Sequence, residues 1–300
     1  MLCQGGGGLL PDYGSRESVI MSKNQLYCVI FSAMLVVGFS LMLYPSISNY
    51  WNSFHSSKAI SNYSQVVSEM DEAEYQMMFQ KAQQFNQYLL ERKNPYILTD
   101  GMQKMYESIL NPDGTGLIGH VEIPSINCSA ALYHTAEERV LQKGIGHLSW
   151  TSLPIGGEST HAVLSGHRGL PTAKLFSDMD KVVEGDYFYI YVLDEVFKYK
   201  VDRILIVEPK ETEELLIVPE KDYCTLVTCT PYGINTHRML VRGERVEVEE
   251  KSKLNIVSEV IQIDPLIVAS IIAIPMLLLL FIWLHIPKAN RRGGRYDTKK

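Results

Sequence analysis

Two long apolar segments interrupt the mixture of hydrophobic and polar positions along the chain. Residues 26–44 carry no charged side chain, and residues 266–286 are similarly apolar, with Trp283 near one end. About 20 apolar residues let a helix cross a hydrocarbon core of roughly 30 Å, and Trp favours the membrane interface. The pattern therefore predicts two transmembrane helices.

A cleaved signal peptide is the alternative for the first segment. Its apolar run is longer than a typical h-region, and Tyr44-Pro45-Ser46 lacks the small-x-small pattern of a cleavage site. We therefore expect the helix to be retained. The residues before it, 1–25, form a leader in which the Gly-rich stretch 1–20 precedes a second Met, which suggests an over-long gene start.

Basic residues predict the orientation of both spans. Lys and Arg crowd the tail at 287–300, whereas none follows residue 44 until Lys58. Short cytoplasmic segments carry an excess of Lys and Arg. We therefore expect a multi-pass protein of the cell membrane, with cytoplasmic leader and tail and the middle of the chain outside.

Between the two spans, the hydrophobic period changes from helical to strand-like. Apolar positions recur mostly every three or four residues over 59–92, which predicts an amphipathic helix. Turn-forming residues at 94–95 and 111–114 bracket a shorter helical piece at 104–110. One further short helix is expected at 173–180.

Beyond residue 116, short runs rich in β-branched and aromatic residues predict strands. Turn residues such as Gly185-Asp186 separate some of these runs, and their spacing favours an all-β barrel or sandwich. The predicted strands cover 117–123, 130–133, 161–164, 187–192, 197–207, 223–228 and 239–248.

Charge and cysteine content narrow the classes of function. The formal net charge is −6 at pH 7 and no basic stripe is present, so we exclude nucleic-acid binding. Cys128, Cys224 and Cys229 lie in the outer region, and since an odd number cannot all pair, at least one thiol is expected to be free. Side chains alternate along a strand, so Cys224 and Cys229 should face opposite sides of a sheet.

Two segments carry residues suited to acyl transfer. In LSGHRG, 164–169, a predicted strand ends at His167, flanked by glycines that let the backbone turn sharply. In TLVTCTPYG, 225–233, Cys229 is nearly the last strand residue, and NTHR, with Arg238, opens the next strand. Together these residues supply a nucleophile, a proton shuttle and a cation.

Each of these residues has a structural alternative when taken alone. A free Cys is commonly a small buried hydrophobe, and other His residues are equally available, namely His134, His147, His161 and His237. No pair shows a C-x-x-C or H-x-x-x-H spacing, so we expect no metal site and no cofactor. Only the combination of segments is specific.

At these segments the chain strongly resembles the sortases, the cysteine transpeptidases of bacterial surfaces. Within that family it looks most like class C, the pilin-polymerising sortases. The segments that carry the resemblance are GHVEIPSIN, VLQKGIGHL, TSLPIGGESTHAVLSGHRGLPTAKLF and TLVTCTPYGINTHRMLVRGERV. The resemblance implies a mainly β fold, an eight-stranded sortase barrel with short helices. It assigns 45–115 to a helical and lid-like region, 116–250 to the catalytic barrel and 251–265 to a linker.

The resemblance also implies roles for site residues. Cys229 would be the nucleophile, His167 the general acid and Arg238 the residue that stabilises the oxyanion. Cys229 would cleave an LPXTG-like sorting signal and hold it as a thioester until a pilin lysine amine resolves it. Thr228 and Arg168 are expected in the cleft or against the substrate.

A lid is a further expectation from the resemblance. Class C enzymes often carry an Asp-Pro-aromatic motif that plugs the cleft, and the corresponding stretch here is Thr99-Asp100-Gly101-Met102. The Asp is retained, but the Pro and the aromatic residue are not. Met102 could still cover the sulfur, and Asp100 could pair with a cationic group.

Two other functions stay open from the sequence. A sortase that attaches single surface proteins to peptidoglycan would use the same residues with a cell-wall amine as acceptor. An inactive membrane-tethered scaffold on a sortase barrel would leave Cys229 unreactive.

Overall fold

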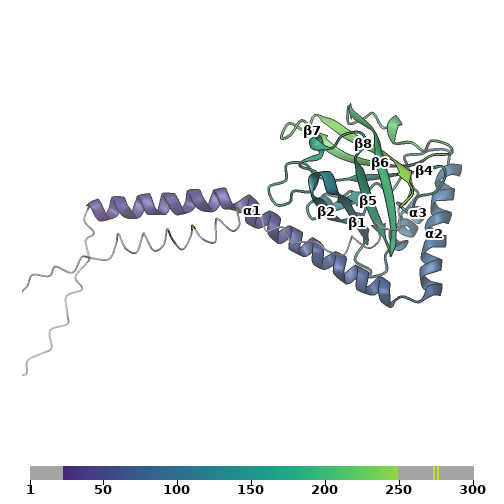
Figure 1. Ribbon diagram of the computed structural model, residues 1–300, viewed down its shortest axis with the longest axis horizontal. Coiled ribbons are helices and arrows are strands. Elements are labelled where there is room, and N and C mark those ends of the chain that lie inside the picture. Colours follow the sequence, from purple (N-terminus) through teal and green to yellow (C-terminus); the bar gives the residue numbers. More distant parts are fainter. Residues whose placement is uncertain (1–22, 249–272, 274–275, 277–300) are drawn as a thin grey trace, which may run out of the picture. The chain divides into compact units, whose positions relative to one another are not determined.

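The computed structural model describes residues 23–248 together with Ala273 and Met276 (Figure 1). Apart from those two, the predicted second span at 266–286 lies outside the described residues, as do the predicted linker at 251–265 and the tail. The chain divides into two compact units, and the boundary falls within the first helix, between Met42 and Leu43.

The first helix, α1 (Lys23–Glu69), contains the first apolar segment. Its part Ile30–Glu69 is long and apolar enough to cross a membrane, with a mean hydropathy of 1.9 in an 18-residue window of which 6% is buried. Large apolar side chains such as Phe31 and Leu41 are exposed. The helix does not end at residue 44 but continues through Pro45.

The part of α1 that belongs to the second unit packs on the barrel. Its residues Tyr63 and Val67 are buried in the main core. The hydrogen bonds that hold it run from Lys174 N to Asn49 Oδ1 (2.7 Å), from Ala131 N to Ser56 Oγ (3.1 Å), from Leu193 N to Tyr63 OH (3.0 Å) and from Tyr63 OH to Ile118 O (2.5 Å).

Two shorter helices follow α1. The expected single helix at 59–92 is wrong, because α1 ends at Glu69 and a second helix, α2 (Glu72–Glu91), begins after Asp71. The Asp71 side chain accepts a hydrogen bond from Glu74 N, so it caps a new helix instead of continuing the old one. Helix α3 (Asp100–Ser108) packs beside α2, with the rings of Phe85 and Tyr106 5.8 Å apart (Figure 1).

Eight strands close into a barrel in the order β1-β2-β3-β4-β7-β8-β6-β5, so the expected eight-stranded barrel is confirmed. The pairs β2–β3 and β4–β7 are parallel and the others antiparallel. The strands are β1 (Leu117–Ile123), β2 (Cys128–His134), β3 (Ile145–His147), β4 (Thr160–Ser165), β5 (Tyr187–Val192), β6 (Glu195–Val207), β7 (Asp222–Thr230) and β8 (His237–Val246).

The connection after β4 differs from its expected helical form. Residues 175–178 form turns, and only a short 3-10 helix follows at Met179–Lys181. Phe176 N donates to His167 O at 3.1 Å, a long-range bond that ties the segment to the end of β4 and replaces a helical one. A small helix, α4 (Glu138–Leu141), precedes β3.

Alternate residues of each strand face two different apolar groups. The main core fills the barrel and includes Cys224 and Leu226 of β7. The residues between them lie on the other face of the sheet. There Val163, Leu215, Val227 and Leu240 form a separate group, joined by the partly buried Leu148, Trp150, Leu205 and Val207. We call this second group the outer cluster.

Candidate active site

Cys229 and Arg238 face each other across two antiparallel strands. Cys229 is the second-last residue of β7 and Arg238 the second residue of β8, and the two are directly paired. Paired residues point to the same face of a sheet, with Cβ atoms about 4.5–5.5 Å apart. Both side chains are partly exposed, so a thiol and a guanidinium meet at an accessible strand end.

His167 lies level with Cys229 on the other side of β7. In the parallel pair of β4 and β7, Ser165 is opposite Val227. Gly166 N donates to Val227 O at 3.0 Å, and Thr228 Oγ1 donates to Gly166 O at 2.8 Å, so the two chains stay together past the end of β4. Continued two residues past Ser165, the same register pairs His167 with Cys229, so we expect the two side chains to be neighbours across these chains.

The three cysteines of the outer region differ in environment. None is in a disulfide. Cys224 is 0% exposed in the main core, whereas Cys229 belongs to the opposite face, which confirms the expected alternation. Burial raises the pKa of the Cys224 thiol well above its usual range and that of Cys128 to about 12. Those two thiols are therefore held protonated and unreactive at neutral pH.

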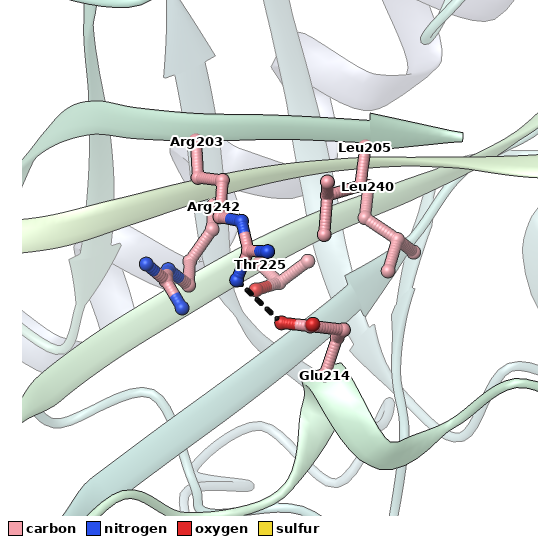
Figure 2. A pocket seen from close by; sticks show the side chains of 6 residues that line it. All are labelled: Arg203, Leu205, Glu214, Thr225, Leu240 and Arg242. Atoms are coloured by element: carbon pink, nitrogen blue, oxygen red, sulfur yellow. Dashed lines mark hydrogen bonds and ion pairs between the residues drawn. The ribbon is translucent and has the colours of Figure 1, made fainter. Parts of the chain in front are cut away.

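On the outer face of the sheet, apolar side chains lie next to Cys229, and charged side chains lie farther from it along β7 and β8. Val227 and Leu240 of the outer cluster continue the face that bears Cys229 and Arg238. Figure 2 shows the pocket that follows, with the ion pair between Arg203 Nη1 and Glu214 Oε2 (2.9 Å) over it. The pocket is lined by Arg203, Leu205, Glu214, Thr225, Leu240 and Arg242.

Backbone carbonyls of the loop between β7 and β8 and of the first residue of β8 bind one nitrogen of the Arg238 guanidinium. Arg238 Nη1 donates to Asn235 O at 3.3 Å and to His237 O at 3.0 Å. Within residues 23–248, both of its hydrogen bonds use this one nitrogen. The Nε and Nη2 donors of the guanidinium thus remain for another acceptor, and the fork geometry of Arg suits an oxyanion.

Two histidines of the barrel, His147 and His161, are buried and structural. His147 bonds Tyr106 OH (2.8 Å) and Ser152 O (2.8 Å), while His161 bonds Leu216 O (2.9 Å) and Thr225 Oγ1 (2.7 Å). Burial lowers the pKa of His147 to about 3 and that of His161 to about 4. Both imidazoles are therefore neutral and buried with both nitrogens engaged, whereas His237 is exposed and pairs with Thr230 beside Cys229.

Thr228 and Arg168, both expected in the cleft, have other contacts. Thr228 is 2% exposed and lies on the inner face, so the structure does not bring it together with Cys229. Arg168 pairs with Asp180 at 2.9 Å and donates to Thr230 Oγ1 at 3.2 Å. Both residues brace the strand ends around His167, and contact with substrate stays a prediction.

The expected lid stretch forms the start of α3. Thr99 caps the helix by accepting a hydrogen bond from Met102 N, and Asp100 is exposed. Met102 packs against the main core. Just before the helix, the Tyr96 ring lies 5.3 Å from that of Trp150, at the edge of the outer cluster. Coverage of the sulfur by this segment stays a prediction.

One contact of the site was not expected from the sequence. Glu138 Oε1 lies 3.2 Å from His167 Nε2, although the two are 29 residues apart in the chain. Glu138 opens the four-residue helix α4, which has no hydrophobic period long enough to detect. The acidic pair before VLQKG was the only available signal.

The chain matches the family model of the sortase domain over residues 121–246. It is similar to sortase C1 of Streptococcus agalactiae, with 47% identity and a TM-score of 0.62 over 64% of this chain and 100% of that chain. It is also similar to sortase C of Streptococcus pneumoniae (45%, TM-score 0.57, 64% and 97% covered). A third similar structure is Clostridium perfringens sortase C with the C-terminal cell wall sorting motif (41%, TM-score 0.57, 64% and 100% covered).

Proposed function

Because the chain belongs to the sortase family, the cysteine transpeptidases, we propose that Cys229 is its nucleophile, His167 its general acid and base, and Arg238 the cation that stabilises the oxyanion. The observation that carries this assignment is the register of β4, β7 and β8. It supports a thiol flanked by an imidazole on one side and a guanidinium on the other, on an accessible face of the barrel.

In the first half of the reaction, the Cys229 thiolate attacks the carbonyl carbon between Thr and Gly of an LPXTG-like sorting signal. The carbonyl electron pair moves onto oxygen, and the free donors of Arg238 stabilise that negative charge. As the tetrahedral intermediate collapses, the C–N bond breaks and the leaving amine takes a proton from the His167 imidazolium. The signal remains on Cys229 as a thioester.

In the second half, an amine of the acceptor attacks the thioester carbon. Neutral His167 takes the proton that the amine loses, and the C–S bond breaks to restore the thiolate. One amide bond has been exchanged for another, so no oxidant or cofactor takes part. A histidine is suited to both directions of transfer because an imidazole titrates near neutral pH.

The outer cluster supports binding of the apolar end of the signal. Thr225 and Leu240 line the pocket, and Thr225 lies four residues before Cys229 on β7. Four strand residues span about 13 Å, and the three residues from Leu to Thr in an extended signal span about 10 Å. An extended peptide with its Thr carbonyl at Cys229 therefore brings its Leu side chain against the outer cluster.

We further propose a pilin lysine as the acceptor. The sortase C enzymes support this, since that of S. pneumoniae is described by its pilin substrate specificity. Attachment of single proteins to a peptidoglycan amine is the alternative, with the same site residues. The apolar part of α1 supports membrane anchoring. A second anchor at 266–286, cytoplasmic termini and an outward-facing barrel complete the proposed topology.

The test uses the full chain in detergent micelles with an LPXTG-containing peptide. We expect intact mass spectrometry to detect a thioester adduct in wild type and in Cys224→Ala, the control at the buried thiol of the same strand, and none in Cys229→Ala. Peptides that carry a pilin-like lysine or a cell-wall stem amine are then offered as acceptors, and the amide product identifies which is used. An adduct that survives in Cys229→Ala would refute the assigned nucleophile.

A further inference from the structure

The Glu138 carboxylate contacts one ring nitrogen of His167. Its Oε1 lies 3.2 Å from His167 Nε2, and the same oxygen accepts a hydrogen bond from Gln142 Nε2, one turn along the chain. The His167 side chain is 26% exposed and that of Glu138 69%. The contact therefore lies at the open rim of the site, where a carboxylate stays solvated.

The protonation of this pair follows from the chemistry of the carboxylate. The hydrogen bond from Gln142, and then that from His167, lower the pKa of the Glu138 carboxyl from its usual range, so Glu138 is ionised at neutral pH. An ionised carboxylate only accepts hydrogen bonds. His167 Nε2 therefore carries the hydrogen in this contact, and Nδ1 is the ring nitrogen left for proton exchange.

We propose that Glu138 is a positioning residue for acyl transfer, which fixes the tautomer and orientation of His167 so that Nδ1 exchanges protons with the leaving and attacking amines. This inference rests on the proposed role of His167. A carboxylate on the far side of an imidazole stabilises the imidazolium that protonates the leaving group. Glu138 itself stays ionised through both half-reactions, and no bond to it forms or breaks.

The charged residues next to His167 and Glu138 in the chain form ion pairs with other partners. Arg168, the next residue, is paired with Asp180, and Arg139 of α4 with Glu137. Cys229 and Arg238 belong to the strands β7 and β8 and not to α4. Glu138 is therefore the anion that faces His167 from α4, and Glu137 is a matched carboxylate that contacts a different cation.

The test compares Glu138→Gln with Glu137→Gln in the full chain, in detergent micelles, with an LPXTG-containing peptide. Because the pair is exposed, we expect Glu138→Gln to lower kcat by about two- to fivefold with KM unchanged. The limb of the pH profile governed by the imidazolium should move to lower pH. Glu138→Asp should recover part of the rate, and Glu137→Gln should match wild type in both respects.

Three outcomes separate this inference from the proposed function. If His167→Gln turns over peptide as fast as wild type, the proposed role of His167 fails, and the inference with it. If His167→Gln is inactive while Glu138→Gln and Glu137→Gln share the wild-type rate and pH profile, only the inference is overturned. A rise in KM alone in Glu138→Gln would also overturn it, because Glu138 would then contact substrate. Thermal unfolding midpoints equal to wild type exclude misfolding.

Discussion

On the inner face of β7, Cys224, Leu226 and Thr228 are enclosed by the barrel, whereas on the outer face Val227 and Cys229 meet the outer cluster and its open edge. The same strand thus carries one buried thiol and one partly exposed thiol. Burial, and after it the negative charge of Asp222, keep the pKa of the Cys224 thiol high. Exposure of a thiol in this strand therefore depends on which face it occupies and how near it lies to the strand end.

The largest effect on the outer face should follow from removal of the guanidinium paired with Cys229. We expect Arg238→Met to lower kcat about 100- to 1,000-fold, the usual range for an oxyanion donor. Arg238→Lys keeps the charge but not the forked set of donors, so its kcat should lie between those of wild type and Arg238→Met. Peptide cleavage kinetics measure both, and a Met variant with wild-type kcat would contradict the assignment.

Paired substitutions on neighbouring residues of β7 sharpen the contrast between the faces. Leu226→Ala opens a cavity in the main core and should lower the free energy of unfolding by about 2–5 kcal/mol. Val227→Ala, on the outer face, should cost about 1 kcal/mol but raise KM for the peptide. Urea unfolding and cleavage kinetics separate the two, and equal effects on both quantities would show that the faces are not distinct.

Acid should weaken the fold through a buried histidine on the outer face, His161. His161 bonds Thr225 on the outer side of β7 and Leu216 on the loop above it. Burial lowers the pKa of His161 to about 4, so the folded state favours the neutral ring. Its contribution is complete above the unfolded-state pKa near 6.5 and is lost as pH falls toward 4, by roughly 2 kcal/mol at pH 4.5. His161→Gln should lose correspondingly less stability between pH 7 and 4.5 in urea titrations, whereas an equal loss would refute this.

Local patterns predicted much of the barrel. Residues 117–123 and 187–192 were assigned as strands with the bounds of β1 and β5, because each is a compact β-branched or aromatic run between turns. The opposite faces of Cys224 and Cys229 followed from their odd spacing alone. In contrast, β3 has three residues and too few positions to show a period, and it was missed.

Long-range contacts account for what the sequence did not disclose. The register of β4 with β7 determines how the chain after Ser165 runs along the end of β7, and a parallel pair has no connecting turn from which its register can be read. The contact of Glu138 with His167 likewise depends on how α4 packs ahead of β3. The expected helix at 173–180 failed because Phe176 bonds His167 instead of its own helical neighbour.

The hydrogen bonds between α1 and the barrel determine where a soluble fragment of this enzyme should begin. Asn49 accepts a hydrogen bond from Lys174, in the connection whose Phe176 bonds His167. A fragment that starts at the first strand would lose this tether and those of Ser56 and Tyr63. Its histidine loop would be less restrained than that of the whole enzyme. The first residue of an assay-ready fragment therefore belongs ahead of Asn49.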